Sequence, residues 1–135
     1  MNAKPSVLFV CIENSCRSQL AEALGRMAGL ETYSAGTRPS GTVDSGAIAS
    51  MAELGYDLAT HRSESIDQFA HREFAATVTM GCGDECAHVR AESRETWPIP
   101  DPKGTDADNY RRVRDDIASR VETLAKRLLD AQTHA

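Results

Sequence analysis

The residues best suited to chemistry form one short segment near the N-terminus, Cys11-Ile-Glu-Asn-Ser-Cys-Arg17-Ser18. An apolar run precedes this segment and a helical pattern follows it, so we predict a loop between a buried strand and a helix. The backbone N–H groups of such a loop converge on one point, to which the helix adds the positive end of its dipole. This combination predicts an anion-binding site.

Three side chains of this loop have the chemistry to act on a bound anion. Arg17 carries a planar, two-pronged donor that matches a tetrahedral oxyanion. The donors that bind the anion also favour the thiolate of Cys11, which could attack the central atom of phosphate or arsenate. Ser18 can donate its hydroxyl to this sulfur or cap the helix. The alternative is a buried structural cysteine beside a surface arginine. The predicted substrate-binding residues are Cys11, Ile12, Glu13, Asn14, Ser15, Cys16, Arg17 and Ser18.

The other three cysteines differ in their expected roles. Cys16 lies inside the loop and is interpreted as a partly buried structural residue. Cys82 and Cys86 are separated by three residues, and glycines on both sides of Cys82 make its backbone permissive. In a reducing cytosol such thiols serve redox chemistry or bind metal more often than they form structural disulfides. With His88 nearby, the pair also fits a zinc site, although no second pair of ligands follows.

Composition excludes several classes of protein. The formal net charge is -5 and no basic stripe is present, which argues against binding to nucleic acid. No apolar run approaches the roughly 20 residues that span a bilayer, and the N-terminus does not read as a signal peptide. We therefore expect a cytoplasmic protein without a membrane partner, whose anion site is local and does not depend on its overall charge.

Strand and helix signals alternate along the chain, which predicts a single α/β domain over residues 1–135. A four-stranded parallel sheet would be flanked by helices in three layers. We expect strands at 6–10, 31–35, 76–80 and 95–98. Helices are expected at 20–27 and 44–55, more weakly at 63–69, and from Asp106 or Asp108 to about Leu128. Ligands of such folds bind beyond the carboxyl ends of the strands, where the predicted strands lead to Cys11, Cys82 and Asp101.

These motifs resemble the low-molecular-weight tyrosine phosphatase family, especially its arsenate reductase branch. The resembling segments occur in the expected order over most of the chain: 8–19, Ala21-Glu22, Tyr33-Ser-Ala-Gly36, 78–86 and Ile99-Pro-Asp-Pro102. The resemblance implies the phosphatase-like fold and makes Asp101 the general acid. A turn or cap aspartate is the alternative for this residue.

The arsenate reductase branch implies a relay of three cysteines. Cys11 would form a covalent adduct with arsenate, Cys82 would attack the Cys11 sulfur and release arsenite, and Cys86 would form the final disulfide with Cys82. The resemblance implies that thioredoxin regenerates this redox-active disulfide, in the service of arsenic detoxification. The three-residue gap between Cys82 and Cys86 is shorter than is usual for such enzymes, so glutaredoxin or a small thiol stays an alternative reductant.

The resemblance implies no tightly bound cofactor, but some related reductases bind potassium. Asn14, Glu22 and Ser34 match three of the ligand positions, while Glu64 stands where aspartate is expected. Asn14 could instead brace the loop through its own hydrogen bonds. His61 is expected at the surface.

Two other functions remain open on the sequence. The first is a phosphatase acting on phosphotyrosine, and a weak activity of that kind could accompany the reductase. The absence of an aromatic residue between Asp101-Pro102 and Tyr110 disfavours a phosphotyrosine pocket. The second is a non-catalytic sensor of arsenic or metal, which would need only the thiols and not Arg17 or Asp101.

Overall fold

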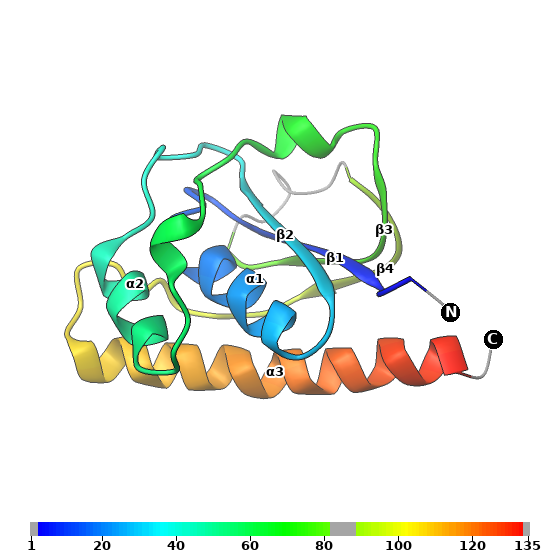
Figure 1. Cartoon of the computed structure of the whole chain (residues 1–135). Coiled ribbons are helices and arrows are strands. Elements are labelled where there is room, and N and C mark those ends of the chain that lie inside the picture. The colour runs from blue at the N-terminus through cyan, green and yellow to red at the C-terminus, as the bar shows by residue number, and fades with distance from the viewer. Residues whose placement is uncertain (1–2, 82–88, 134–135) are drawn as a thin grey trace.

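The computed structural model describes residues 3–81 and 89–133, which form a four-stranded sheet flanked by helices (Figure 1). The strands are β1 (Ser6–Cys11), β2 (Glu31–Gly36), β3 (Glu73–Thr79) and β4 (Arg90–Thr96). The helices are α1 (Arg17–Met27), α2 (Ser45–Ala52) and α3 (Ala107–Thr133), with two 3₁₀ helices, η1 (Leu58–Thr60) and η2 (Ile66–Phe69). All strand pairs are parallel, in the order β2-β1-β3-β4, which confirms the predicted fold class.

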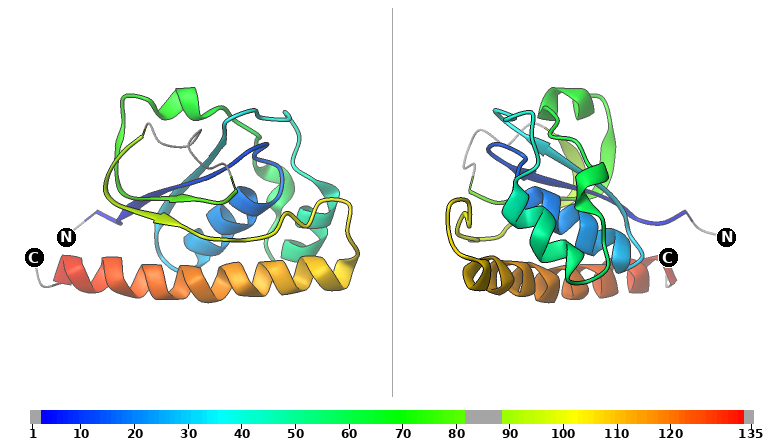
Figure 2. Two further views of the ribbon diagram at one scale, coloured as in Figure 1. Left: turned by 180° about the vertical axis from the view of Figure 1, so that it is seen from behind. Right: turned by 60° about the vertical axis from the view of Figure 1, so that its left-hand side comes forward.

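The central position of β1 explains its continuous apolar sequence. Val7 and Phe9 face the main core beneath the three α-helices, whereas Leu8 and Val10 face a second core that includes Phe69 of η2. Figure 2 shows α3 running along one side of the sheet and η2 lying on the opposite side. A strand covered on both faces needs apolar residues at every position, so it lacks the alternation of apolar and polar residues seen in half-exposed strands.

Strand β4 lies elsewhere in the sequence than we predicted. It covers Arg90–Thr96, and the predicted range of 95–98 overlaps only its end. β4 pairs only with β3 and is an edge strand with alternate side chains exposed, so its residues are mostly polar. The predicted range is centred near Trp97, which is buried just beyond the end of the strand.

The predicted helices need smaller corrections. Residues 63–69 contain only the single turn η2, which begins after a cap by Ser65. Met27 and Leu54 lie within the predicted helical ranges but are 54% and 42% exposed, because Met27 is the last residue of α1 and Leu54 lies beyond the end of α2. Asp106 is the start of α3, since its side chain accepts the backbone N–H of Asn109 at 2.9 Å.

Helix α3 matches its predicted periodicity and supports the site from below. Its buried face is Tyr110, Val113, Ile117, Val121, Leu124 and Ala125. Both α1 and α2 contact this helix, so the segment that follows β1 is held between the sheet and α3. None of the helices in the described ranges combines the length and apolar character needed to cross a membrane.

Candidate active site

The loop between β1 and α1 is held by backbone hydrogen bonds on its outer side. The carbonyls of residues 11, 12, 13 and 15 accept N–H groups from residues 37, 38, 40 and 44, at 2.8–3.3 Å. In a trans peptide the N–H points opposite to the carbonyl, so the N–H groups that follow these carbonyls turn to the inner side. This backbone geometry is compatible with the anion-binding loop that the sequence predicts, and anion binding stays a prediction.

Two residues allow the chain to follow this tight path. Asn14 has φ of 53°, in the left-handed region that asparagine tolerates better than most side chains. Gly36, at the end of β2, lies against the loop, where a Cβ would stand 2.6 Å from the carbonyl oxygen of Ile12. A side chain at Gly36 would push the loop out of shape.

The sulfur of Cys11 lies at the bottom of the loop and receives a directed hydrogen bond. The residue is 3% exposed, and its Sγ lies 2.9 Å from the Oγ of Ser18. The Nδ2 of Asn14 donates to the same Oγ at 2.7 Å. Its Oδ1 faces the backbone N–H of Glu64, which fixes the orientation of the amide. Because Ser18 Oγ already accepts from Asn14, its own proton is available for donation to the Cys11 sulfur.

The guanidinium of Arg17 has one nitrogen bonded to the protein backbone and another without a partner among the described residues. Its Nη1 donates to the carbonyl of Ile99 at 3.0 Å, and its Nη2 lies 4.0 Å from Asp101 Oδ2. Its Nε is the one buried side-chain nitrogen or oxygen in the described residues with no hydrogen-bond partner. A Cβ at Gly81 would lie 2.3 Å from Arg17 Nη1, so this glycine makes room for the guanidinium. A buried, unpaired donor beside a thiol is suited to an anionic ligand.

These residues line a pocket of about 330 Å³. The lining residues are Cys11, Ile12, Glu13, Ser15, Cys16, Arg17, Arg38 and Asp101. The carboxyl of Asp101 is 45% exposed at its rim, and its Oδ1 accepts the backbone N–H of Lys103 at 3.1 Å. The sequence analysis missed Arg38, whose signal was its place just beyond the carboxyl end of β2.

The structure brings together only part of the predicted site. Cys11, Arg17 and Asp101 meet at one pocket. Cys82 and Cys86, together with His88, lie outside the described residues, so their roles stay predictions. The described chain nevertheless reaches Gly81 directly beside the guanidinium of Arg17.

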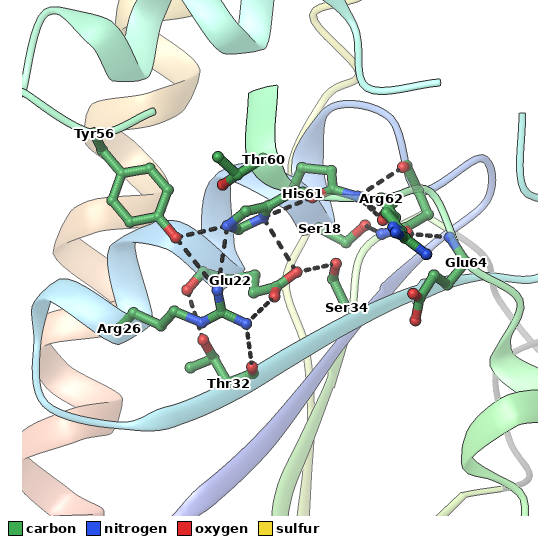
Figure 3. Close-up of polar contacts among 12 residues, drawn as sticks. Ser18, Glu22, Arg26, Thr32, Ser34, Tyr56, Thr60, His61, Arg62 and Glu64 are labelled. Atoms are coloured by element: carbon green, nitrogen blue, oxygen red, sulfur yellow. Dashed lines mark hydrogen bonds and ion pairs between the residues drawn. The ribbon is translucent and has the colours of Figure 1, made fainter. Parts of the chain in front are cut away.

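The predicted potassium ligands Glu22 and Ser34 meet beside an arginine (Figure 3). The Oε2 of Glu22 pairs with Arg26 Nη2 at 2.5 Å, and its Oε1 accepts the hydroxyl of Ser34 at 2.5 Å. Asn14 directs its oxygen to the backbone N–H of Glu64 and to Gln19. Since Arg26 already neutralises the carboxylate, this arrangement does not fit a potassium ion, and the site remains an untested prediction.

The burial of the His61 side chain differs from the sequence-based prediction. Its side chain is only 3% exposed, although we expected a surface residue. Its Nδ1 faces the Oε1 of Gln19 at 3.0 Å, and its Nε2 faces the hydroxyl of Tyr56 at 2.6 Å (Figure 3). Gln19 in turn donates to the backbone carbonyl of Asn14. This buried chain of hydrogen bonds braces the loop from behind, and no local sequence signal marks it.

Comparison with known proteins shows where this architecture occurs. The family model for low molecular weight phosphotyrosine protein phosphatase matches residues 6–134. Arsenate reductase 1 of Staphylococcus epidermidis is 36% identical over 132 residues, covering 93% of this chain and 98% of that protein. The glutaredoxin arsenate reductase of Synechocystis is 34% identical over 128 residues, covering 90% and 97%.

Solved structures give the same picture. An arsenate reductase in a phosphate-binding state superposes with a TM-score of 0.82 at 33% identity, covering 92% of this chain and 98% of that one. The YwlE arginine phosphatase from Geobacillus stearothermophilus has a TM-score of 0.78 at 24% identity, covering 96% of each chain. The second likeness concerns the fold alone.

Proposed function

The chain belongs to the low molecular weight phosphotyrosine protein phosphatase family, and we propose that within it this protein is an arsenate reductase. One observation carries the proposal: Cys11 and Arg17, whose buried Nε has no hydrogen-bond partner among the described residues, line a single small pocket. The resemblance to arsenate reductases over almost the whole chain supports the same substrate, a small tetrahedral oxyanion.

The first step follows from the geometry of the loop. The thiolate of Cys11 attacks arsenic and displaces one oxygen, which leaves as water after it accepts protons. Backbone N–H groups and Arg17 hold the remaining oxygens, and Ser18 supports the thiolate before attack. Asp101 stands at the rim, where its acid form can donate a proton to the departing oxygen. The product is arsenate(V) bound to sulfur.

The second stage transfers two electrons from thiols to arsenic. The thiolate of Cys82 attacks the Cys11 sulfur, the sulfur–arsenic electron pair moves to arsenic, and arsenite leaves as arsenic(III). The resulting Cys11–Cys82 disulfide is then attacked by Cys86, which frees Cys11 and leaves a Cys82–Cys86 disulfide. The sequence supports these two roles, since both cysteines lie outside the described residues.

An external dithiol must reduce the final disulfide. We propose thioredoxin, and with it a cytoplasmic location, where such reductants are kept reduced. The name of the Synechocystis relative keeps glutaredoxin as the alternative. Thioredoxin and glutaredoxin, each supplied with its own reducing system, can be compared directly in an assay of NADPH oxidation that depends on arsenate.

A phosphatase is the second candidate, because the same nucleophile can form a phosphoenzyme. Within the described part of the chain no aromatic side chain lines the pocket, so nothing there grips a phosphotyrosine ring. A small oxyanion therefore fits better, and hydrolysis of aryl phosphates should be a weak side activity.

Three cysteine variants test the proposal through single-turnover detection of arsenite and mapping of disulfides by mass spectrometry. Cys11→Ser should abolish arsenite formation and aryl phosphate hydrolysis, because both need its sulfur. Cys82→Ser should stop multiple turnover. Cys86→Ser should release one arsenite per enzyme and accumulate the Cys11–Cys82 disulfide. Weak phosphatase activity should survive in the last two variants, which controls for folding of the loop. Wild-type turnover of both with thioredoxin would exclude the relay.

A further inference from the structure

The second cysteine of the loop sits in a different environment from the first. Cys16 is 3% exposed, and its Sγ lies 3.3 Å from the hydroxyl of Tyr110 in α3. That hydroxyl also bonds the Oδ2 of Asp44, which caps α2 by accepting the backbone N–H of Gly46 at 3.1 Å. The loop, α2 and α3 therefore meet at this one hydroxyl group.

The direction of these hydrogen bonds follows from counting protons. An ionised Asp44 can only accept, so the single proton of Tyr110 is donated to Asp44. The Tyr110 oxygen is then left to accept, and Cys16 must approach it as an S–H donor. Cys11 differs, because Ser18 Oγ accepts from Asn14 and has its own proton available to donate to the Cys11 sulfur. One loop thus contains two cysteines with hydrogen bonds of opposite polarity.

Burial and charge favour the protonated form of this thiol. Burial raises the pKa of Cys16 to about 11, and the negative charges of Asp44 and Asp101 add to the increase. Tyr110 and Ser15 form hydrogen bonds with this sulfur, and a hydrogen bond donated to it would lower its pKa, so the direction of the Tyr110 bond decides whether that bond opposes the increase. The ring of Tyr110 packs so closely on α2 that a Cβ at Gly46 would lie 2.4 Å from it, which fixes the position of the hydroxyl.

We propose that Tyr110, oriented by Asp44, is a positioning residue that keeps Cys16 as an unreactive thiol, so that the loop contains a single nucleophile. The state of Cys16 is inferred from the structure, and only its importance for a thiol relay rests on the proposed function. In a relay of thiols, a reactive Cys16 would compete with Cys82 for the sulfur of Cys11. When Cys16 keeps its proton and donates it to the Tyr110 oxygen, the thiol cannot compete, and its side chain still fills the core.

The test measures alkylation of Cys16 by iodoacetamide, in which the thiolate displaces iodide. The parent protein carries Cys11→Ser, Cys82→Ser and Cys86→Ser, so that Cys16 is its one thiol. Asp44→Ser keeps a cap on α2 but is too short to hold Tyr110, whose proton can then turn to the sulfur. Alkylation at pH 8 should become at least tenfold faster, since each unit of pKa decrease raises the thiolate fraction about tenfold.

The matched control adds Tyr110→Phe to Asp44→Ser. This double variant lacks the same negative charge and is loosened at least as much, but it has no tyrosine hydroxyl proton to donate, so its rate should be clearly lower than that of Asp44→Ser. Circular dichroism checks that each protein is folded. An unchanged rate in Asp44→Ser, or equal acceleration in the double variant, would overturn the proposal. Because no arsenate is involved, either result is independent of the proposed reductase activity.

Discussion

Arg17 contributes two separate functions with one guanidinium group. Nη1 ties the side chain to Ile99, while the buried Nε has no hydrogen-bond partner among the described residues, and in the proposed function it serves the ligand. A lysine keeps the charge, but its single ammonium group cannot donate hydrogen bonds to Ile99 and to the ligand in the geometry of the guanidinium. We therefore expect Arg17→Lys to lower kcat/KM for arsenate about a hundredfold, equivalent to roughly 2–3 kcal/mol of lost oxyanion stabilisation.

Steady-state kinetics of arsenite formation check this expectation. Arg38→Lys is the matched control, since Arg38 lines the same pocket but is exposed. The decrease in kcat/KM for Arg38→Lys should be clearly smaller than the decrease for Arg17→Lys. If both variants lose activity equally, general positive charge rather than the geometry of Arg17 holds the substrate.

Arg26 gives a second prediction at the scale of a residue. Its guanidinium pairs with Glu22 at 2.5 Å and also donates to the carbonyl of Thr32 at 3.2 Å. With this charge in place, replacing sodium chloride by potassium chloride at equal concentration should leave the melting temperature unchanged. In Arg26→Met the carboxylate loses its counter-charge, so a potassium-specific increase should appear. A potassium-specific increase in the wild type would contradict this interpretation.

At the scale of elements, Glu53 joins α2 to α3. Its carboxylate pairs with Arg111 and Arg114 of α3, each at 2.7 Å. Hydrogen bonds from Arg111 and then Arg114 lower the pKa of Glu53 to about 2 from an ordinary value of 4.5. A depressed pKa in the folded state means that the stabilisation is complete above 4.5 and is lost as the pH falls through about 2.

Glu53→Gln should therefore lower the melting temperature at pH 7, and the difference from wild type should shrink between pH 4.5 and pH 2. The effect should be small, because the carboxylate is exposed to solvent. Glu122→Gln, at an exposed position of α3, serves as the control for the loss of a surface carboxylate. A difference that stays constant down to pH 2 would show that the ion pairs do not link the two helices.

At the scale of the whole molecule, the anion loop connects most of the fold. It continues β1, begins α1, bonds the segment before α2, and reaches the segment before α3 through Arg17 and Ile99. Binding of an anion in this loop should therefore stabilise the entire domain. Phosphate at a hundred times its dissociation constant should add about 2.7 kcal/mol to the free energy of unfolding.

Thermal unfolding in phosphate and in sodium chloride of equal ionic strength measures this effect. Arg17→Lys should reduce the phosphate-specific increase in melting temperature. Equal stability in both salts would place the anion elsewhere or show that the loop binds phosphate too weakly to matter.

The sequence by itself determined the parts of this protein that depend on near neighbours. The strand at β1, the loop after it and a last helix that starts at Asp106 or Asp108 were predicted correctly, and Cys11 and Arg17 of that loop line one pocket. Each rests on periodicity, capping or spacing within about a dozen residues, and these signals act before any tertiary contact forms. The central strand was clearest, because burial on both faces demands apolar residues throughout.

Only the tertiary structure decided the features that depend on distant partners. β4 was misplaced because an edge strand is recognised by its neighbour β3 and not by its own polar sequence. Arg38 reaches the pocket because parallel strands end at one edge of the sheet. Tyr110 meets Cys16 because α3 packs beneath the loop, which assigns that tyrosine a role that spacing along the chain cannot reveal. Such contacts are set by the order of the strands and the packing of the helices, and the folded chain alone brings these residues together.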